Sequence, residues 1–164
     1  MGLEANPFAA FASRVKLNWE PDPDALQQEA HTTARAATKM LRDQGIDDSR
    51  PFAALPADIA LRALDAEANS LLLAGSISPL PLHKSLVLLE CLQRHATQTC
   101  YPHLLLALVN ALVHRISNLH FGPEVGAGTP KSDVPVISCW LRKSHAWSTT
   151  CVWFQARRFR RQPS

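Results

Sequence analysis

The sequence predicts an all-α protein, a small antiparallel bundle of about four helices with an irregular basic C-terminal tail. The chain has 164 residues, of which 46% are hydrophobic and 19% charged, and this composition is typical of one globular domain. Apolar residues recur at helical spacing through its middle. Short connections rich in Gly or Pro separate these periodic stretches, which favours antiparallel neighbours.

The first expected helix covers residues 25–43 and follows a leader without regular structure. Residues 1–23 contain three prolines, so we expect them to be irregular. Asp24 and Gln27 form a capping-box pattern at the start of the helix, and Gly45 ends it. The apolar positions of this helix are Leu26, Ala30, Ala34, Ala37 and Leu41. Their spacing predicts one buried face.

Three further helices are expected in the bundle. The second covers 56–75, from Pro56 in its first turn to Gly75. The third covers 81–97 and has a wide apolar face. The fourth covers 103–120 and is apolar nearly all round over its first half, so we expect it at the centre of the bundle. The core positions expected in this fourth helix are Leu106, Leu108, Val109 and Leu112.

The pattern after the fourth helix changes to a linker and a tail. The expected segments are the leader 1–23, the helical bundle 24–122, the linker 123–133 and the basic tail 134–164. The tail fits two local structures. Its β-branched residues could form a lone hairpin with strands near 134–139 and 149–153, or Thr149 or Thr150 could cap a short basic helix over 149–161.

Charge is unevenly distributed along the chain. Residues 1–70 hold 7 basic and 11 acidic side chains, and residues 71–130 hold 3 basic and 2 acidic ones. Residues 131–164 hold 7 basic side chains and 1 acidic one, which gives this part a net charge of +6. A basic segment of this kind indicates an anionic partner such as nucleic acid. A tail that only keeps the protein in solution is the alternative.

One short motif in the tail combines aromatic residues with arginines. The run Val152-Trp153-Phe154-Gln155 is followed closely by three arginines, and it resembles the recognition helix of a homeodomain, whose pattern is close to VWFQNRRxK. The resemblance implies that the Trp and Phe anchor the helix, the Gln faces base edges and the arginines contact phosphates. Ala156 stands where the family has its adenine-contacting Asn, which implies binding largely through phosphates. The expected nucleic-acid-binding residues are Trp153, Phe154, Gln155, Arg157, Arg158, Arg160 and Arg161.

A second cluster combines thiols with imidazoles near the expected connection of the third and fourth helices. Its members are Cys91, His95, Cys100 and His103. Two thiolates and two imidazoles form a suitable tetrahedral set for structural zinc. The alternative is two buried thiols and two surface histidines, and we predict no bound metal. The four cysteines of the chain are expected to be free.

No catalytic signature is present, so we expect a non-enzymatic regulatory protein without a cofactor. Its helical body would bind a protein partner or a second copy of itself, and its basic tail would bind nucleic acid. The alternative function is a helical interaction or adaptor module with no nucleic-acid role. The longest apolar run, Leu104 to Val113, is shorter than the about 20 residues that span a bilayer. We therefore expect no membrane contact and an intracellular protein, nuclear in a eukaryote and otherwise cytoplasmic.

Overall fold

The secondary structure is mostly helical. A computed structural model of the chain describes residues 5–53 and 58–159. These residues contain six α-helices, one π-helical turn and one two-stranded sheet. The predicted all-α class is therefore confirmed. Within the described ranges, every helix is too short or too polar to cross a membrane.

The N-terminal leader contains a helix. α1 spans Pro7–Leu17, so the irregular structure predicted for residues 1–23 is wrong in this part. Asn6 caps the helix, because its side-chain oxygen accepts hydrogen bonds from the backbone N–H groups of Phe8 (2.9 Å) and Ala9 (3.1 Å). Proline in a first turn favours a helix start. The prediction of irregular structure counts the same proline, Pro7, as a helix breaker.

The first predicted helix, over 25–43, is confirmed with a slightly earlier start. α2 spans Pro23–Asp43, and its cap is Asp22, whose carboxylate accepts a hydrogen bond from the backbone N–H of Asp24 (3.2 Å). All five predicted apolar positions of this helix are buried. Gly45 follows the helix in the left-handed conformation, with φ of 78°, as a C-terminal glycine should.

The second predicted helix, over 56–75, is wrong for most of its length. Residues 58–65 have no helical structure, and only α3, Ala66–Ser70, is helical; residues 56 and 57 lie outside the described part of the chain. The backbone N–H of Arg62 donates to Nδ1 of His83 (2.8 Å) instead of to a helical carbonyl. A contact to a distant side chain therefore replaces the local hydrogen bond that the sequence pattern predicted.

The third and fourth predicted helices are confirmed with shorter C-terminal ends. α4 spans Pro79–Gln93, and α5 spans Tyr101–Ala111 and continues into the π-helical turn η1, Leu112–Ile116. The chain then forms a hairpin of β1, Leu119–Phe121, and β2, Val125–Ala127, within the segment predicted to contain the end of a helix and a linker.

The predicted irregular tail, 134–164, begins instead with the longest helix of the described chain. α6 spans Val136–Phe159, so both the hairpin and the short helix over 149–161 are replaced by one long helix as far as the described residues extend. The first half of α6 is part of the core, because the Trp140 side chain is fully buried and its indole N–H donates to the carbonyl of Leu104 (3.0 Å).

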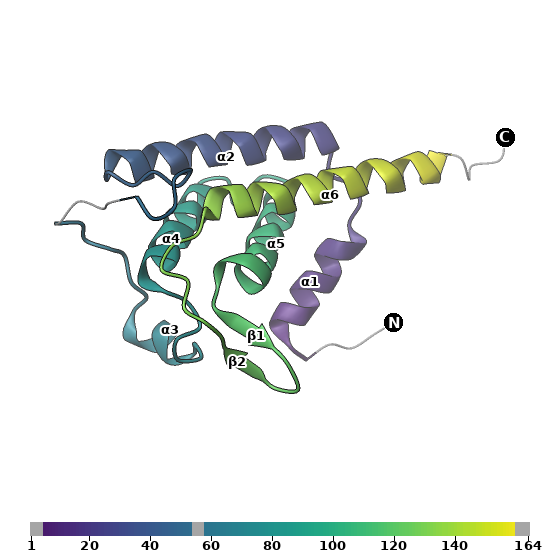
Figure 1. Ribbon diagram of the computed structural model, residues 1–164. Helices are drawn as coiled ribbons and strands as arrows, with labels where there is room; N and C mark the ends of the chain where they lie inside the picture. Colours follow the sequence, from purple (N-terminus) through teal and green to yellow (C-terminus); the bar gives the residue numbers. More distant parts are fainter. Residues whose placement is uncertain (1–4, 54–57, 160–164) are drawn as a thin grey trace.

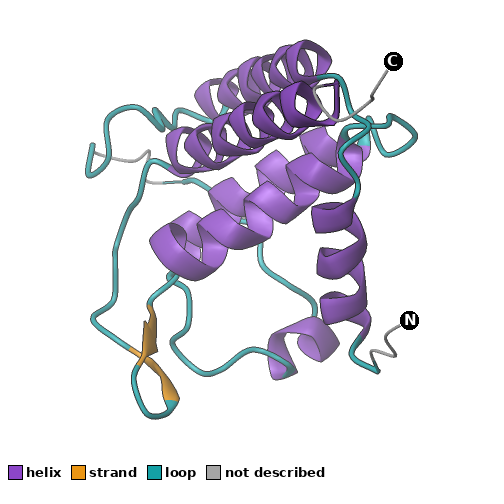
Figure 2. Ribbon diagram, turned by 90° about the vertical axis from the view of Figure 1, so that its right-hand side faces the viewer, coloured by secondary structure: helices purple, strands orange, loops and turns teal. Residues whose placement is uncertain are grey.

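The helices α2, α4, α5 and α6 form two crossed layers (Figures 1 and 2). α2 and α6 lie side by side, and α4 and α5 run beneath them at a steep angle (Figures 1 and 2). The predicted simple antiparallel bundle does not describe this core, because α6, which packs antiparallel to α2, lies in the segment predicted as an irregular tail (Figure 1). Of the four predicted core positions, Leu106 and Leu108 in α5 are buried. Val109 in α5 and Leu112 at the start of η1 are only half-buried, so the prediction is confirmed for two of the four.

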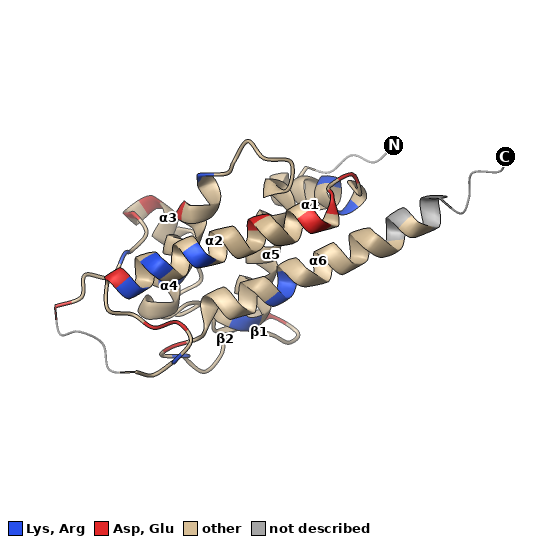
Figure 3. Cartoon of the chain, turned by 90° about the horizontal axis from the view of Figure 1, so that it is seen from above, with Lys and Arg blue, Asp and Glu red and all other residues tan. Residues whose placement is uncertain are grey.

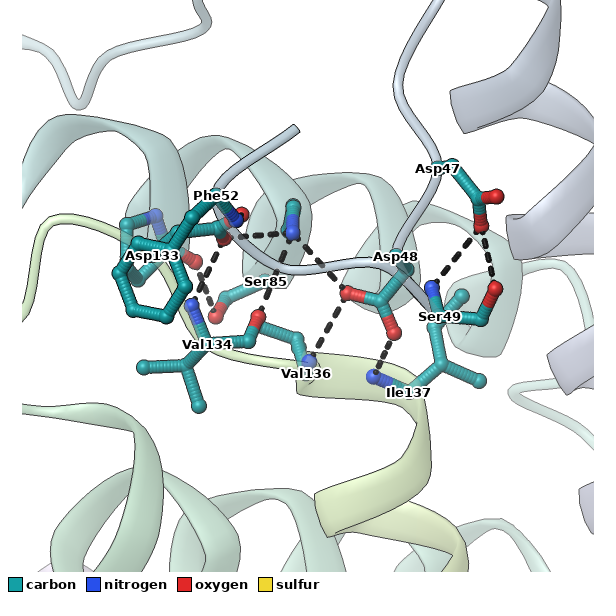
Figure 4. A network of polar contacts seen from close by, with 11 residues as sticks. Asp47, Asp48, Ser49, Phe52, Ser85, Asp133, Val134, Val136 and Ile137 are labelled. Carbon is teal, nitrogen blue, oxygen red and sulfur yellow. Dashed lines mark hydrogen bonds and ion pairs between the residues drawn. The ribbon is translucent and has the colours of Figure 1, made fainter. Parts of the chain in front are cut away.

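A fully buried lysine fixes the start of α6. Nζ of Lys84, on α4, lies 2.6 Å from Oδ1 of Asp133 and 3.3 Å from Oδ1 of Asp48. Asp48 accepts hydrogen bonds from the backbone N–H groups of Val136 and Ile137, both 2.9 Å, and so caps α6 from a distant loop (Figure 4). Burial raises the pKa of Asp48 more than the neighbouring Lys84 lowers it. The network ties α4, the loop after α2 and α6 together.

Candidate nucleic-acid interface

A groove follows the seam between α2 and α6. It consists of a cavity of about 480 Å³ and a second cavity of about 280 Å³, and the two share His31 and Leu141. We call the two cavities together the α2–α6 groove. Its lining residues that carry a full charge are Arg35, Lys39, Arg42, Asp43, Asp48 and Arg142.

The charge of the α2–α6 groove is mainly positive. The exposed Arg35, Lys39 and Arg42 come from the second half of α2, and the exposed Arg142 comes from the first half of α6. Because the two helices are antiparallel, these halves lie beside each other (Figures 1 and 3). Oδ2 of Asp43 lies 3.6 Å from Nζ of Lys39, and both side chains are exposed. This ion pair is therefore weak, and a bound phosphate can replace Asp43 as the partner of Lys39. Cations on both sides of a groove can bind an anionic chain between them.

The floor of the groove is apolar and its two sides carry imidazoles. Ala30 is buried and Leu141 is half-buried, and together they separate the exposed His31 of α2 from the exposed His145 of α6. Gln27 lies at the end of the smaller cavity. Its side-chain Nε2 donates to Oγ of Ser148 (3.0 Å), and Ser148 donates to the carbonyl of Pro23 (3.2 Å). These bonds hold the amide of Gln27 in a fixed position.

The residues predicted from the homeodomain resemblance lie near the far end of α6. Trp153 is 49% exposed, more than an anchor in a domain core should be. Of the other predicted residues, α6 includes the backbone of Phe154, Gln155, Arg157 and Arg158, whereas their side chains are outside the described part, as are Arg160 and Arg161 entirely. Residues 152–159 are thus helical as part of α6, and the contacts of the motif to nucleic acid remain a prediction.

The four residues considered for zinc do not form a metal site. The described residues contain no group of three or more His, Cys, Asp or Glu side chains placed to hold a metal ion. Cys91 contacts Sδ of Met40 at 3.4 Å, while Nε2 of His103 bonds to the carbonyl of Asn18 at 2.9 Å. Burial raises the pKa of Cys91, and it raises the pKa of Cys100 to about 11. Burial thus favours the protonated thiol at both positions, as expected of buried cysteines that pack as small apolar side chains.

Sequence reasoning missed the basic residues of α2. Arg35, Lys39 and Arg42 are spaced by four and three positions, which places them on one helix face. The net charge of residues 1–70 hides this basic face, because acidic side chains outnumber basic ones there. That Arg142 lines the adjoining smaller cavity depends on the packing of α6 against α2, which no local pattern predicts.

The chain was compared with known protein families, with curated proteins and with solved structures, and no match was found in any of the three. The function therefore has to be inferred from the chemistry of the α2–α6 groove and of the basic end of α6.

Proposed function

We propose that this protein is a non-enzymatic regulatory protein that binds nucleic acid largely through phosphates. The observation that carries the proposal is the placement of Arg35, Lys39, Arg42 and Arg142 around one groove. Phosphate contacts from Lys and Arg supply most of the affinity of sequence-independent nucleic-acid binding. The imidazoles of the groove add groups that can stack on bases.

The arginines that we predict to bind nucleic acid follow the groove residues of α6 in the sequence. From Arg142 to Arg157 the helix advances about 22 Å, at about 1.5 Å per residue. One bound nucleic-acid chain would therefore contact the groove first and the predicted arginines of the homeodomain-like motif further along the same helix. This arrangement favours binding by position and charge over reading of sequence, because Ala156 occupies the place of the base-reading Asn in that motif.

A second candidate function is a helical interaction or adaptor module that binds a protein partner or a second copy. The observation that favours it is a run of exposed leucines after α3. Leu71, Leu72 and Leu73 are 83%, 41% and 46% exposed. Exposed apolar residues in sequence are typical of a protein-binding surface. The two functions can also coexist, with the leucines on the body and the groove on α2 and α6.

The dependence of binding on salt tests the proposed function. Four groove cations and four arginines near the C-terminus limit the slope of log K against log salt to about −7 on duplex DNA and about −6 on a single strand. Arg35→Ala and Arg142→Ala should each weaken binding to every sequence and flatten the slope by about one unit. Arg14→Ala is the matched control, because Arg14 is also exposed but lies on α1, outside the groove.

Two outcomes would contradict the proposal. One is the absence of binding to single-stranded or duplex nucleic acid at about 50 mM salt. The other is that the Arg35→Ala and Arg142→Ala variants bind as tightly as the Arg14→Ala control. In the latter case any affinity would come from elsewhere on the chain, and the adaptor function would be favoured.

A further inference from the structure

We propose that the α2–α6 groove binds single-stranded nucleic acid and holds one unpaired base between His31 and His145. This inference rests on the proposed function and specifies its ligand. It depends on three features of the groove: its shape, the chemistry of its smaller cavity and the fixed position of Gln27 at its end.

The shape of this face is unsuited to the major groove of a duplex. The major groove of B-DNA is about 12 Å wide, and one helix with its side chains is about 10–12 Å across. A recognition helix therefore has to protrude alone. Here α2 and α6 lie side by side (Figure 3), so they present a surface about two helices wide. The two cavities of the groove lie along the seam between them. An extended single strand can lie in this groove.

The smaller cavity has the chemistry of a site for one base. Its volume is about 280 Å³, just below the range of about 300–1,000 Å³ that is typical of pockets for drug-sized ligands. Ala30 and Leu141 give it an apolar floor, and His31 and His145 stand on its two sides. Unpaired bases stack on the imidazole ring of histidine and on the plane of an arginine guanidinium, which Arg142 supplies here. A base in a duplex cannot enter, because both of its faces are already stacked.

The larger cavity continues from this site with the groups that a phosphate backbone needs. Arg35 lies one helical turn after His31 on α2, and Lys39 lies one turn further. A strand whose base lies between the imidazoles therefore has its next phosphates beside these cations. The surroundings of the smaller cavity are ordered in advance, since Gln27 is bonded to Ser148 and Nε2 of Gln27 lies 3.5 Å from Nδ1 of His145. Such preorganisation lowers the entropy cost of binding.

The test compares probes of equal length by fluorescence anisotropy at one salt concentration. The probes are a 12-nucleotide oligothymidylate, the corresponding oligouridylate and a 12-base-pair DNA duplex. We expect at least one single strand to bind about tenfold or more tightly than the duplex. His31→Ala and His145→Ala should each weaken single-strand binding by about 5- to 150-fold, the range that corresponds to loss of one stacking contact, and should leave duplex binding nearly unchanged.

Controls separate this inference from the proposed function. His114→Ala and His120→Ala remove exposed histidines that lie outside the groove, and both should bind like the native protein. Because His31 and His145 are exposed, their variants should fold, which circular dichroism verifies. Equal or tighter binding of the duplex, or native affinity in both groove variants, would overturn the single-strand inference while the proposed function stands. Absence of binding to all three probes would overturn the proposed function and this inference together.

Discussion

Replacement of Lys84 by Met should remove the cation from a buried group of charges and cause a large loss of stability. The Lys84 side chain is fully buried, and the side chains of Asp48 and Asp133 are 5% and 8% exposed. In the variant both carboxylates stay in the interior without an opposite charge. Removing one partner of a buried ion pair costs about 3–5 kcal/mol. Because the free energy of unfolding of a domain is about 5–15 kcal/mol, the loss is a large fraction of the total.

The loss of stability caused by Lys84→Met should depend on pH and should be smaller at low pH. Burial already raises the pKa of Asp48, and Lys84 is one of the groups that lower it, so the substitution raises that pKa further. A carboxyl group whose pKa is raised in the folded state contributes stability below its unfolded pKa of about 3.9 and loses that contribution as the pH rises through the folded pKa. The difference in stability between the Lys84→Met variant and the native protein should therefore shrink as the pH falls from about 7 toward 4.

Urea denaturation followed by circular dichroism measures both effects. At about 2–4 °C per kcal/mol for a chain of this size, the melting temperature should also fall by about 6–20 °C. Lys16→Met, at an exposed position on α1, is the matched control and should stay within about 0.5 kcal/mol of the native protein. A Lys84→Met variant as stable as this control at pH 7 would refute the reasoning.

The effect of Asp133→Asn on stability should have opposite signs in the native and the Lys84→Met backgrounds. In the native background Asp133→Asn should destabilise, because Asp133 accepts hydrogen bonds from the ammonium of Lys84 (2.6 Å) and from the backbone N–H of Phe52 (3.0 Å). In the Lys84→Met background the same change should stabilise, because it removes one of two like charges from the interior. If Asp133→Asn destabilises equally in both backgrounds, the charges are not coupled and the network is held together by its hydrogen bonds alone.

Two further predictions concern the core. Leu108→Ala, at a position 2% exposed in α5, should cost about 2–5 kcal/mol in urea denaturation, and a melting temperature unchanged within error would show that α5 is not central. Burial lowers the pKa of both His83 and His103, so stability should be full above their unfolded pKa of about 6.5 and should decline as the pH falls below it. His83→Gln, which cannot be protonated, should flatten this decline in melting curves recorded between about pH 8 and 5.

The helices that sequence reasoning predicted correctly have their signals close together in the chain. In α2 the apolar period and the glycine after its end are local, and α4 and α5 likewise have proline in the first turn and a dense apolar face. The predicted helix over 56–75 had a similar pattern but fails in the structure. There the backbone N–H of Arg62 is bonded to His83, 21 residues away in the chain, and the local pattern contains no information about that partner.

For α6 the prediction fails in the opposite way, because the structure has a long helix where the local sequence did not predict one. The group that caps its first turn is Asp48, 88 residues from Val136 in the chain. Residues 144–150 in the middle of α6 include four Ser and Thr residues, which have lower helix propensity than Ala or Leu. In the structure these hydroxyls bond to the carbonyl four residues earlier, as Thr149 does to His145 (3.0 Å) and Thr150 to Ala146 (2.7 Å). Tertiary packing and a distant cap therefore determine this helix, and with it the position of the groove.

The buried charges and the exposed groove share one residue, and this explains how the groove stays positive. Asp48 lines the larger cavity, yet its carboxylate points to the ammonium of Lys84 and to two backbone N–H groups at the start of α6. Lys84 and the two N–H groups partly offset its charge, and the four exposed cations of the groove outnumber its two carboxylates, Asp43 and Asp48. The arginines of the groove are exposed, so a bound phosphate can contact them directly at a distance shorter than the screening length of about 8 Å. The acidic network therefore positions α6 against α2 without cancelling the attraction of the groove for an anionic chain.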